Sequence, residues 1–195
     1  MTEFETNCLS CAAKLMTEVI GFTSPRNIDD RGEFSRIYDF KEINSPYFNN
    51  GASQISFSYN KLQNTRRGLH VRVENPLEYK LVRPIQGSIF DVVLDCRQNS
   101  KSFGTWISFV LKSDLGDGIC VPGGFAHGIQ TLEDQTIVIY AMNVPFEEKL
   151  DYAINGNDSY LKINWPSNPS VMSEKDLNAP RWNEFVYSLA GNKNI

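Results

Sequence analysis

Histidine is scarce in this chain, since His70 and His127 are the only two among 195 residues. Histidine is the side chain whose ordinary pKa makes it a proton acceptor at neutral pH, so proton-transfer chemistry points first to these two positions. Two histidines exclude a metal site built from three, and they do not form an H-x-H pair. The chain therefore disfavours a metal site.

Several familiar sequence motifs are also missing. The chain has no G-x-x-x-x-G-K, no G-x-G-x-x-G and no G-x-S-x-G. These patterns mark phosphate-binding loops, dinucleotide-binding folds and the serine nucleophile of many hydrolases. We therefore expect neither a nucleotide cofactor nor serine-hydrolase chemistry.

Signals for membranes, secretion and nucleic acid are weak or missing as well. No apolar run approaches the roughly 20 residues that span a bilayer. Glu3 and Glu5 stand where a secretory signal would carry lysine or arginine. The net charge of -4 argues against a general nucleic-acid binder, which needs a basic surface. These features predict a cytoplasmic protein that binds neither membrane nor nucleic acid.

Cysteine is limited to four residues, of which Cys8 and Cys11 form a lone C-x-x-C. A structural zinc site needs a second pair of ligands, and a redox C-x-x-C needs a βαβ setting. The sequence supplies neither. We interpret residues 1–20 as an N-terminal extension with a weakly helical pattern and two reduced thiols.

Short strands dominate the rest of the chain. Aromatic residues make up 12% of it, and apolar stretches alternate with glycine, asparagine and proline at intervals of roughly 8–12 residues. This texture predicts an all-β sandwich rather than a parallel sheet. The expected strands are Gln54–Tyr59, Leu69–Val73, Lys80–Gln86, Ser88–Asp95, Thr105–Leu111, Gly118–Val121, Gly128–Leu132 and Thr136–Met142.

The C-terminal stretch has a helical pattern instead. Ser173 begins a helix-start pattern, apolar residues recur at helical spacing from Phe185 to Leu189, and Gly191 is a plausible stop. We predict one domain over residues 21–195. Its fold is a jelly roll with short peripheral helices at the N- and C-termini.

The surroundings of both histidines indicate a site. Arg67, Lys80 and Arg83 lie close to His70 in sequence, and strand alternation could aim several of them at one face. Cations gathered in one concave surface are costly unless an anion binds there, and a diphosphate would meet that need. His127 lies in a glycine-rich turn where a ligand could approach the backbone, although a purely structural histidine is equally plausible.

Three further residues have two readings from the sequence alone. Asp91 is a candidate hydrogen-bond partner that would fix the tautomer of His127. Asp176 reads as a helix-start residue, three positions after Ser173. Tyr140 could be an ordinary core residue or a proton donor at the edge of a site.

Taken in order, several segments make the chain resemble the dTDP-4-dehydrorhamnose 3,5-epimerase family, the cupin-like sugar-nucleotide epimerases of deoxysugar pathways. The resemblance runs from about residue 25 to 180. Any one segment is weak evidence, whereas the ordered set is highly specific. The segments are Asp30–Phe34, Arg67–His70, Lys80–Arg83, Gly87–Arg97, Ser102–Trp106, Val121–Gly128, Asn157-Asp158, Ile163–Pro166 and Ser173–Asp176.

The resemblance implies a jelly-roll homodimer that inverts carbons 3 and 5 of a nucleotide-linked 4-keto sugar without a redox cofactor or a metal. It places His70 at the catalytic base, Asp176 at the carboxylate paired with that base, Lys80 beside the 4-keto oxygen and Tyr140 at the acid.

The resemblance also implies a set of substrate-binding residues. Arg31 and Arg67 match arginines that hold the diphosphate, and the segment with Arg31 and Phe34 crosses to the other subunit in relatives. His127 and Asp91 match a supporting pair near the pocket.

Departures from the family pattern leave the substrate open. Phe146 stands where many relatives have a second tyrosine, Ile129 replaces a phenylalanine, and the match near Ser56 is poor. The alternatives are therefore a single-site 3- or 5-epimerase of a CDP- or GDP-linked sugar, a non-catalytic sugar-nucleotide-binding jelly roll, and a metal-dependent cupin.

Overall fold

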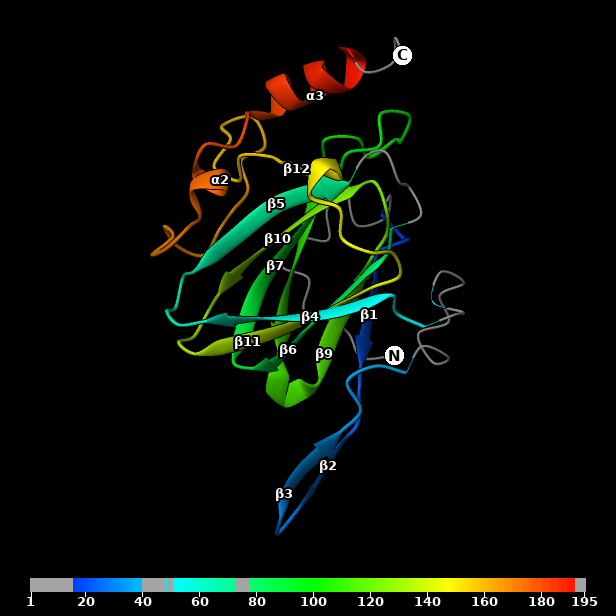
Figure 1. Ribbon diagram of the computed structural model, residues 1–195. Coiled ribbons are helices and arrows are strands. Elements are labelled where there is room, and N and C mark those ends of the chain that lie inside the picture. Colours follow the sequence, from blue (N-terminus) through cyan, green and yellow to red (C-terminus); the bar gives the residue numbers. More distant parts are fainter. Residues whose placement is uncertain (1–15, 40–47, 49–50, 73–77, 192–195) are drawn as a thin grey trace.

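Two five-stranded antiparallel sheets face each other in the computed structural model, and a separate two-stranded hairpin projects away from them (Figure 1). The structure describes residues 16–39, 48, 51–72 and 78–191. Successive strands from the fourth to the twelfth mostly alternate between the two sheets. This crossing pattern, with α-helices only near the C-terminus of the described chain, confirms the predicted all-β jelly-roll sandwich.

The first sheet has the strand order β1–β9–β6–β11–β4 and the second has the order β12–β5–β10–β7–β8. The first sheet consists of β1 (Ile20–Thr23), β9 (Asp117–Val121), β6 (Lys80–Gln86), β11 (Thr136–Met142) and β4 (Gln54–Asn60). The second consists of β12 (Asp151–Ala153), β5 (Arg66–Arg72), β10 (Phe125–Thr131), β7 (Ser88–Asp95) and β8 (Trp106–Lys112). The hairpin consists of β2 (Arg26–Asp29) and β3 (Gly32–Ser35).

Branched aliphatic side chains from both sheets fill the space between them. Val82, Ile119 and Val138 come from the first sheet, and Val93 and Ile129 come from the second. All five are at most 1% exposed. Such residues favour strands because their side chains pack well on a pleated surface. This core fixes the two sheets against each other and leaves a cavity toward one edge.

The helices α2 (Glu174–Leu177) and α3 (Trp182–Gly191) follow the last strand (Figure 1). Trp182 and Phe185 of α3 pack with Val92 and Leu94 of β7 in a second buried cluster. Truncating a buried aromatic residue of this kind costs about 3–5 kcal/mol, so α3 is firmly anchored. Its anchoring holds the preceding helix α2 beside β5. Two 3-10 turns, η2 (Ser113–Leu115) and η3 (Glu148–Leu150), complete the described elements.

The predicted and observed strands agree best at the centre of the sheets. The bounds of β6, β7 and β11 are those predicted from the sequence. The strands β4 and β9 differ by one residue at one end, and β8 is shifted by one residue at both ends. The predictions for β5 and β10 began three residues too late. The prediction missed β1, β2, β3 and β12, which have at most four residues, none of them buried. Strands this short and exposed carry no alternating pattern.

At the C-terminus the structure has two helices where the sequence showed one helical region. Ser173 caps α2, since its Oγ accepts a hydrogen bond from the Asp176 N–H at 3.1 Å. Pro180 lies in the segment between the helices, and an Asp158 carboxylate oxygen accepts from the Trp182 N–H at 2.9 Å where α3 begins. The described residues end at Gly191, so the end of the helix at this glycine stays a prediction.

The N-terminal prediction is mostly outside the described residues. Cys8, Cys11 and the rest of residues 1–15 lie there, while residues 16–19 form a turn rather than a helix. Met16 is 1% exposed and packs in the core between the sheets. The boundary at residue 20 between an extension and a domain stays a prediction.

Candidate active site

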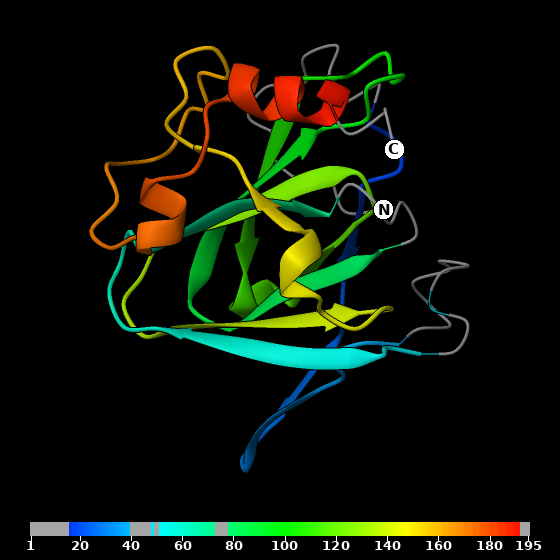
Figure 2. The ribbon, with the colours of Figure 1, turned by 45° about the horizontal axis from the view of Figure 1, so that its top comes forward.

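A cavity of about 620 Å³ is lined by residues of β4 and β11 from the first sheet and of β5 and β10 from the second. Figure 2 shows how the strands of the two sheets are arranged in space. The segment from Val171 to Asp176 and the residues Phe146 and Glu147 complete its wall. The inward side chains of β4 are Gln54, Ser56 and Ser58, which are polar where a sandwich core is apolar. A polar wall inside a sandwich indicates a binding site.

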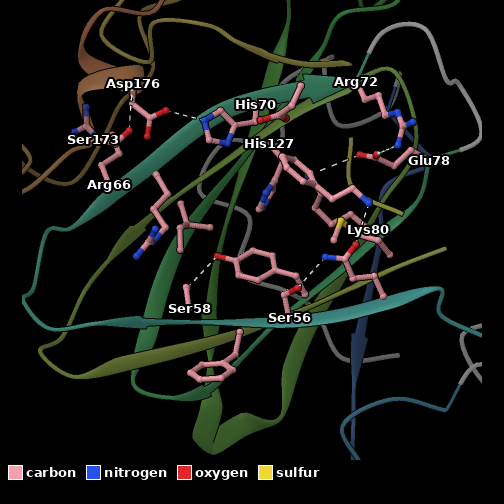
Figure 3. Close-up of a pocket in the computed structure, with 18 of the residues that line it drawn as sticks. Ser56, Ser58, Arg66, His70, Arg72, Glu78, Lys80, His127, Ser173 and Asp176 are labelled. Atoms are coloured by element: carbon pink, nitrogen blue, oxygen red, sulfur yellow. Dashed lines mark hydrogen bonds and ion pairs between the residues drawn. The ribbon is translucent and has the colours of Figure 1, made fainter. Parts of the chain in front are cut away.

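His70 projects into this cavity from β5 and is paired with Asp176. The His70 Nε2 lies 2.6 Å from the Asp176 Oδ1, and the two side chains are 30% and 3% exposed (Figure 3). A carboxylate that accepts from Nε2 fixes the neutral tautomer with its proton on that atom, which leaves the lone pair on Nδ1. The arrangement therefore provides an oriented proton acceptor with one face toward the cavity.

The surroundings of Asp176 keep it ionised. Burial would raise the pKa of Asp176, but the hydrogen bond and charge of His70 and the hydrogen bonds from the Gly68 N–H and from Ser173 lower it below the ordinary value. A charged Asp176 stabilises the imidazolium that forms when His70 takes a proton. The interpretation of Asp176 as a helix-start residue was correct, because its N–H donates to the Ser173 Oγ. It did not include the pairing of the Asp176 side chain with His70.

A β-bulge in the pairing of β5 and β10 brings Arg67 and His70 into one cavity. The register shifts between His127 and Ile129 of β10, and both Arg67 and His70 line the cavity. Residues three apart on a regular strand face opposite sides, and a bulge removes that restriction. Gly68 lies at this point with a φ of 96°, and a Cβ there would stand 2.6 Å from the His127 carbonyl oxygen. Only glycine fits this close approach.

A second histidine–aspartate pair lies directly across the strand from the first. His127 is the cross-strand partner of His70. Its Nε2 lies 2.8 Å from the Asp91 Oδ2, with the two side chains 6% and 0% exposed. The hydrogen bond between His127 and Asp91 that the sequence predicted is present. His127 contributes to the cavity wall, whereas Asp91 lies behind it.

Tyr140 reaches the cavity from β11, on the sheet opposite His70. Its hydroxyl lies 3.3 Å from the Ser58 Oγ. Burial raises the pKa of Tyr140 to about 12, and this outweighs the hydrogen bond to Ser58 and the charge of Arg67, which lower it. Tyr140 therefore holds its proton at neutral pH and is a proton donor rather than an acceptor.

Lys80 begins β6 and lines the cavity beside Met142, its partner on β11. Its Nζ lies 3.9 Å from the Glu78 Oε1, and its side chain is 20% exposed. An ammonium group in this partly desolvated position can stabilise negative charge on a ligand oxygen.

Two arginines give the cavity a positive end. Arg66 is 1% exposed, and it binds the side-chain oxygens of Gln130 and Asn157 and the Ser167 carbonyl. Arg67 donates from Nε to the Asn60 Oδ1 at 2.7 Å. Among the residues that the structure describes, neither arginine has a carboxylate partner. Burial lowers the pKa of Arg66 to about 10, which leaves it charged at neutral pH.

Arg83 does not join this set, so its predicted alignment with Arg67 and Lys80 was wrong. Arg83 lies three residues after Lys80 on β6 and therefore on the other face of the sheet. Its guanidinium donates to the carbonyls of Arg36 and Ile37. Arg83 anchors the segment that follows the hairpin rather than the cavity.

Arg31 and Phe34 lie on the hairpin of β2 and β3, which projects from the two sheets (Figure 1), and neither lines the cavity. The Arg31 side chain is 90% exposed and pairs with Asp29, its Nη2 lying 2.6 Å from the carboxylate. Phe34 is 73% exposed. Within one chain these two predicted binding residues do not meet His70.

Phe146 does lie at the cavity, half-exposed, and its N–H donates to the Gln54 Oε1 at 2.9 Å.

A charged cluster of Arg72, Glu78 and Glu147 at the cavity was not predicted from the sequence. The cluster joins residues up to 75 positions apart. The only local signal was that Arg72 lies two residues after His70 and thus on the same strand face.

Within residues 16–39, 48, 51–72 and 78–191, no group of three or more histidine, cysteine, aspartate or glutamate side chains is arranged to hold a metal ion. The same part of the chain contains no helix long and apolar enough to cross a membrane.

The cavity offers an oriented base in His70, a phenol that holds its proton in Tyr140, an ammonium group in Lys80 and a positive end at Arg66 and Arg67. Together these groups suit proton transfer at a carbon next to a carbonyl of an anionic ligand.

A sequence profile described as dTDP-4-dehydrorhamnose 3,5-epimerase matches residues 14–184 of the chain. Among curated proteins, the chain is 36% identical over 167 residues to a dTDP-4-dehydrorhamnose 3,5-epimerase of Sinorhizobium fredii. The match covers 85% of this chain and 86% of that protein. The matched segment contains the cavity residues from Gln54 to Asp176.

Solved structures agree with the sequence match. A dTDP-4-dehydrorhamnose 3,5-epimerase of Bacillus anthracis, solved with TDP and PPi bound, is 33% identical with a TM-score of 0.77, over 85% of this chain and 94% of that one. A dTDP-6-deoxy-D-glucose-3,5-epimerase of Legionella pneumophila, solved in complex with dTDP-4-keto-L-rhamnose, is 26% identical with a TM-score of 0.80, over 88% and 92% of the two chains.

Proposed function

Because this chain belongs to the dTDP-4-dehydrorhamnose 3,5-epimerase family, we propose that it inverts carbon 3, carbon 5 or both in a nucleotide-diphospho-4-keto-6-deoxysugar. The chain is an epimerase, and thus an isomerase, of deoxysugar biosynthesis. The observation that carries the finer proposal is the His70–Asp176 pair, with its 2.6 Å hydrogen bond, in a cavity also lined by Lys80 and Tyr140.

The first step is proton removal by His70. The ketone at carbon 4 acidifies carbons 3 and 5, because the carbanion formed at either carbon is an enolate. The Nδ1 lone pair of His70 takes the proton, and the charged Asp176 stabilises the resulting imidazolium. The negative charge develops on the keto oxygen. Lys80 stabilises it there, and one donor of this kind contributes about 3–4 kcal/mol in a desolvated site.

The second step is return of a proton from the opposite face by Tyr140. Tyr140 lies on the sheet opposite His70 and holds its proton at neutral pH, with a pKa of about 12. Inversion requires a donor on the face opposite the base, and a hydroxyl in this position supplies one. Ser58, 3.3 Å from the Tyr140 hydroxyl, orients it.

The positive end binds the diphosphate. Arg67 has the bidentate geometry that suits phosphate and only an amide oxygen as its present partner. The cations at this end have no carboxylate partner among the described residues, so an anion compensates them. The relatives solved with TDP and with a dTDP-linked sugar support a dTDP-linked substrate.

We also propose a homodimer in which the β2–β3 hairpin of one subunit brings Arg31 and Phe34 to the cavity of the other. The hairpin forms its own two-stranded sheet, and Ile28 and Phe34 are 68% and 73% exposed on it. Ile55, Phe57 and Tyr59 on the outer face of β4 are at least half-exposed as well. Apolar residues gathered in this way favour association with a second copy. A cytoplasmic location stays a prediction.

Mixing two inactive variants tests the dimer. Hybrids of Arg31→Ala and His70→Ala subunits contain one cavity with both residues intact, so part of the activity should return on mixing. Mass analysis of the mixture confirms whether hybrids form. Hybrids that form without any return of activity contradict the exchange of the hairpin.

Incubation with dTDP-, CDP- and GDP-linked 4-keto-6-deoxysugars in deuterated water tests the reaction. Deuterium should enter carbon 3, carbon 5 or both of the dTDP-linked sugar, and NMR of the product shows which carbons are inverted. Label at a single carbon identifies a single-site epimerase. No label with any of the three sugar nucleotides contradicts the proposed reaction and favours a binding protein.

A further inference from the structure

Lys80 has a charged environment that the proposed mechanism does not use. The Glu78 carboxylate lies between two cations, with its Oε1 3.9 Å from the Lys80 Nζ and its Oε2 3.3 Å from the Arg72 Nη1. Figure 3 shows the three side chains together at one end of the cavity, away from Ser173 and Asp176. The Glu78 and Arg72 side chains are only 14% and 6% exposed. Water therefore screens these charges poorly.

A carboxylate in this position has two opposite effects on an enolate. It attracts the Lys80 ammonium and so holds it at the cavity wall. Its own negative charge, however, opposes negative charge that develops on a ligand oxygen beside Lys80. An unbalanced Glu78 would therefore cancel part of the stabilisation that Lys80 provides.

Arg72 supplies the balancing charge and is itself held in place. Its Nη1 donates to the Pro145 carbonyl at 2.9 Å, and its Nη2 lies 2.6 Å from the Glu147 Oε1. His70 and Arg72 are two residues apart on β5, so the same strand face carries the base and this arginine. The guanidinium is thus fixed by backbone and side chain before any ligand binds.

We propose that Glu78 and Arg72 are positioning residues for Lys80. Glu78 holds the ammonium at the cavity, and Arg72 neutralises Glu78 so that the charge of Lys80 remains available to the enolate oxygen. The inference rests on the proposed function, because it assigns Lys80 to that oxygen. It predicts that the harm from losing Arg72 comes largely from the carboxylate left behind.

Steady-state kinetics of single and double variants, with a dTDP-linked 4-keto-6-deoxysugar, test this prediction. Arg72→Met should lower kcat by about 50-fold with KM changed less than about threefold, because only the transition state carries the new charge. Glu78→Gln should lower kcat by about fivefold through the loss of the tether to Lys80. The double variant should match Glu78→Gln and so regain about tenfold over Arg72→Met.

Glu18→Gln is the control. It removes a carboxylate from an ion pair with Arg97, and neither residue lines the cavity; the Glu18 side chain is 48% exposed. Such an exposed pair contributes little, so kcat should stay within about threefold of the wild type. Adding Glu18→Gln to Arg72→Met should give no recovery of kcat.

A double variant, Arg72→Met with Glu78→Gln, that is no faster than Arg72→Met overturns the inference. Circular dichroism and thermal melting establish that each variant folds. If Arg72→Met does not fold, the same comparison with Arg72→Gln, which keeps a polar side chain, gives the answer.

Lys80→Met separates this inference from the proposed function. Near-normal turnover of Lys80→Met contradicts the role of Lys80 in the mechanism itself. A slow Lys80→Met together with no rescue in the double variant contradicts only the role of Arg72 and Glu78.

Discussion

The two histidine–aspartate pairs of this protein are chemically alike but differently placed. His70 and His127 face each other across β5 and β10, and each ring binds an aspartate through Nε2 at 2.6 and 2.8 Å. The His70 side chain is 30% exposed, whereas that of His127 is 6% exposed. Asp176 is held by the cap of a short helix, and Asp91 lies within β7, an interior strand of its sheet.

The contrast shows how burial separates the roles of identical residue pairs. A proton acceptor must reach the carbon that it deprotonates, and of the two histidine rings that line the cavity, the ring of His70 is the more exposed. The buried pair fixes the shape of the wall from which His70 projects. The Asp91 Oδ1 is buried with no hydrogen-bond partner among the described residues. A histidine and an aspartate in contact are therefore not enough to identify a base.

Replacing each histidine by glutamine should give the largest difference in kcat between the two pairs. His70→Gln should lower kcat by about 10³-fold or more, because general base catalysis contributes this much. His127→Gln should keep kcat within about tenfold of the wild type and act mainly through stability. Steady-state kinetics measure both, with dTDP affinity and thermal melting as controls for folding. Equal losses of kcat in the two variants would contradict the division of roles.

Replacing the two aspartates should also separate the pairs, with a smaller loss of kcat than replacing the histidines. Asp176→Asn removes the charge that stabilises the His70 imidazolium, so kcat should fall by about 10²-fold. Asp91→Asn places an amide in a fully buried site and should lower the free energy of unfolding by about 1–3 kcal/mol. Urea unfolding and kinetics of both variants separate the two outcomes. A larger kcat loss in Asp91→Asn than in Asp176→Asn would reverse the assignment.

Acid titration of stability should give the smallest effect. The pKa of Asp176 is lowered in the folded protein, so its contribution to stability is present above the ordinary aspartate pKa of about 3.9 and is lost as the pH falls through the folded value. Asp176→Asn should therefore lose less stability than the wild type between about pH 5 and the acid range. Urea midpoints at a series of pH values measure this, and parallel curves for the two proteins would argue against a charged Asp176.

The sequence predicted the long strands of the fold. In the site, it predicted the cations near His70 and the hydrogen bond between His127 and Asp91. The strands β6, β7 and β11 were predicted to the residue because they are long and apolar. The hairpin with Arg31 escaped prediction, since its strands are short and exposed and lack a buried face. Arg83 was misplaced because it lies three residues from Lys80, which on a regular strand means opposite faces.

The partners in the site depend on contacts between distant parts of the chain. Local pattern predicted the helix start at Ser173, but the bond between Asp176 and His70 spans 106 residues. Only the family resemblance suggested that pairing. The ion pair of Arg72 with Glu147 joins residues 75 positions apart, and no sequence motif predicted it. Spacing along one strand cannot indicate which residues of another element will meet it.

Solvent deuterium tests most directly whether His70 removes the proton and Tyr140 returns one from the other face. A dTDP-linked 4-keto-6-deoxysugar is incubated in deuterated water with the wild type, His70→Gln or Tyr140→Phe, and NMR follows label and configuration separately. We expect labelled and inverted sugar with the wild type, label with little inversion with Tyr140→Phe, and neither with His70→Gln. Label entering at a near-normal rate with His70→Gln would contradict it, as would full inversion at a near-normal rate with Tyr140→Phe.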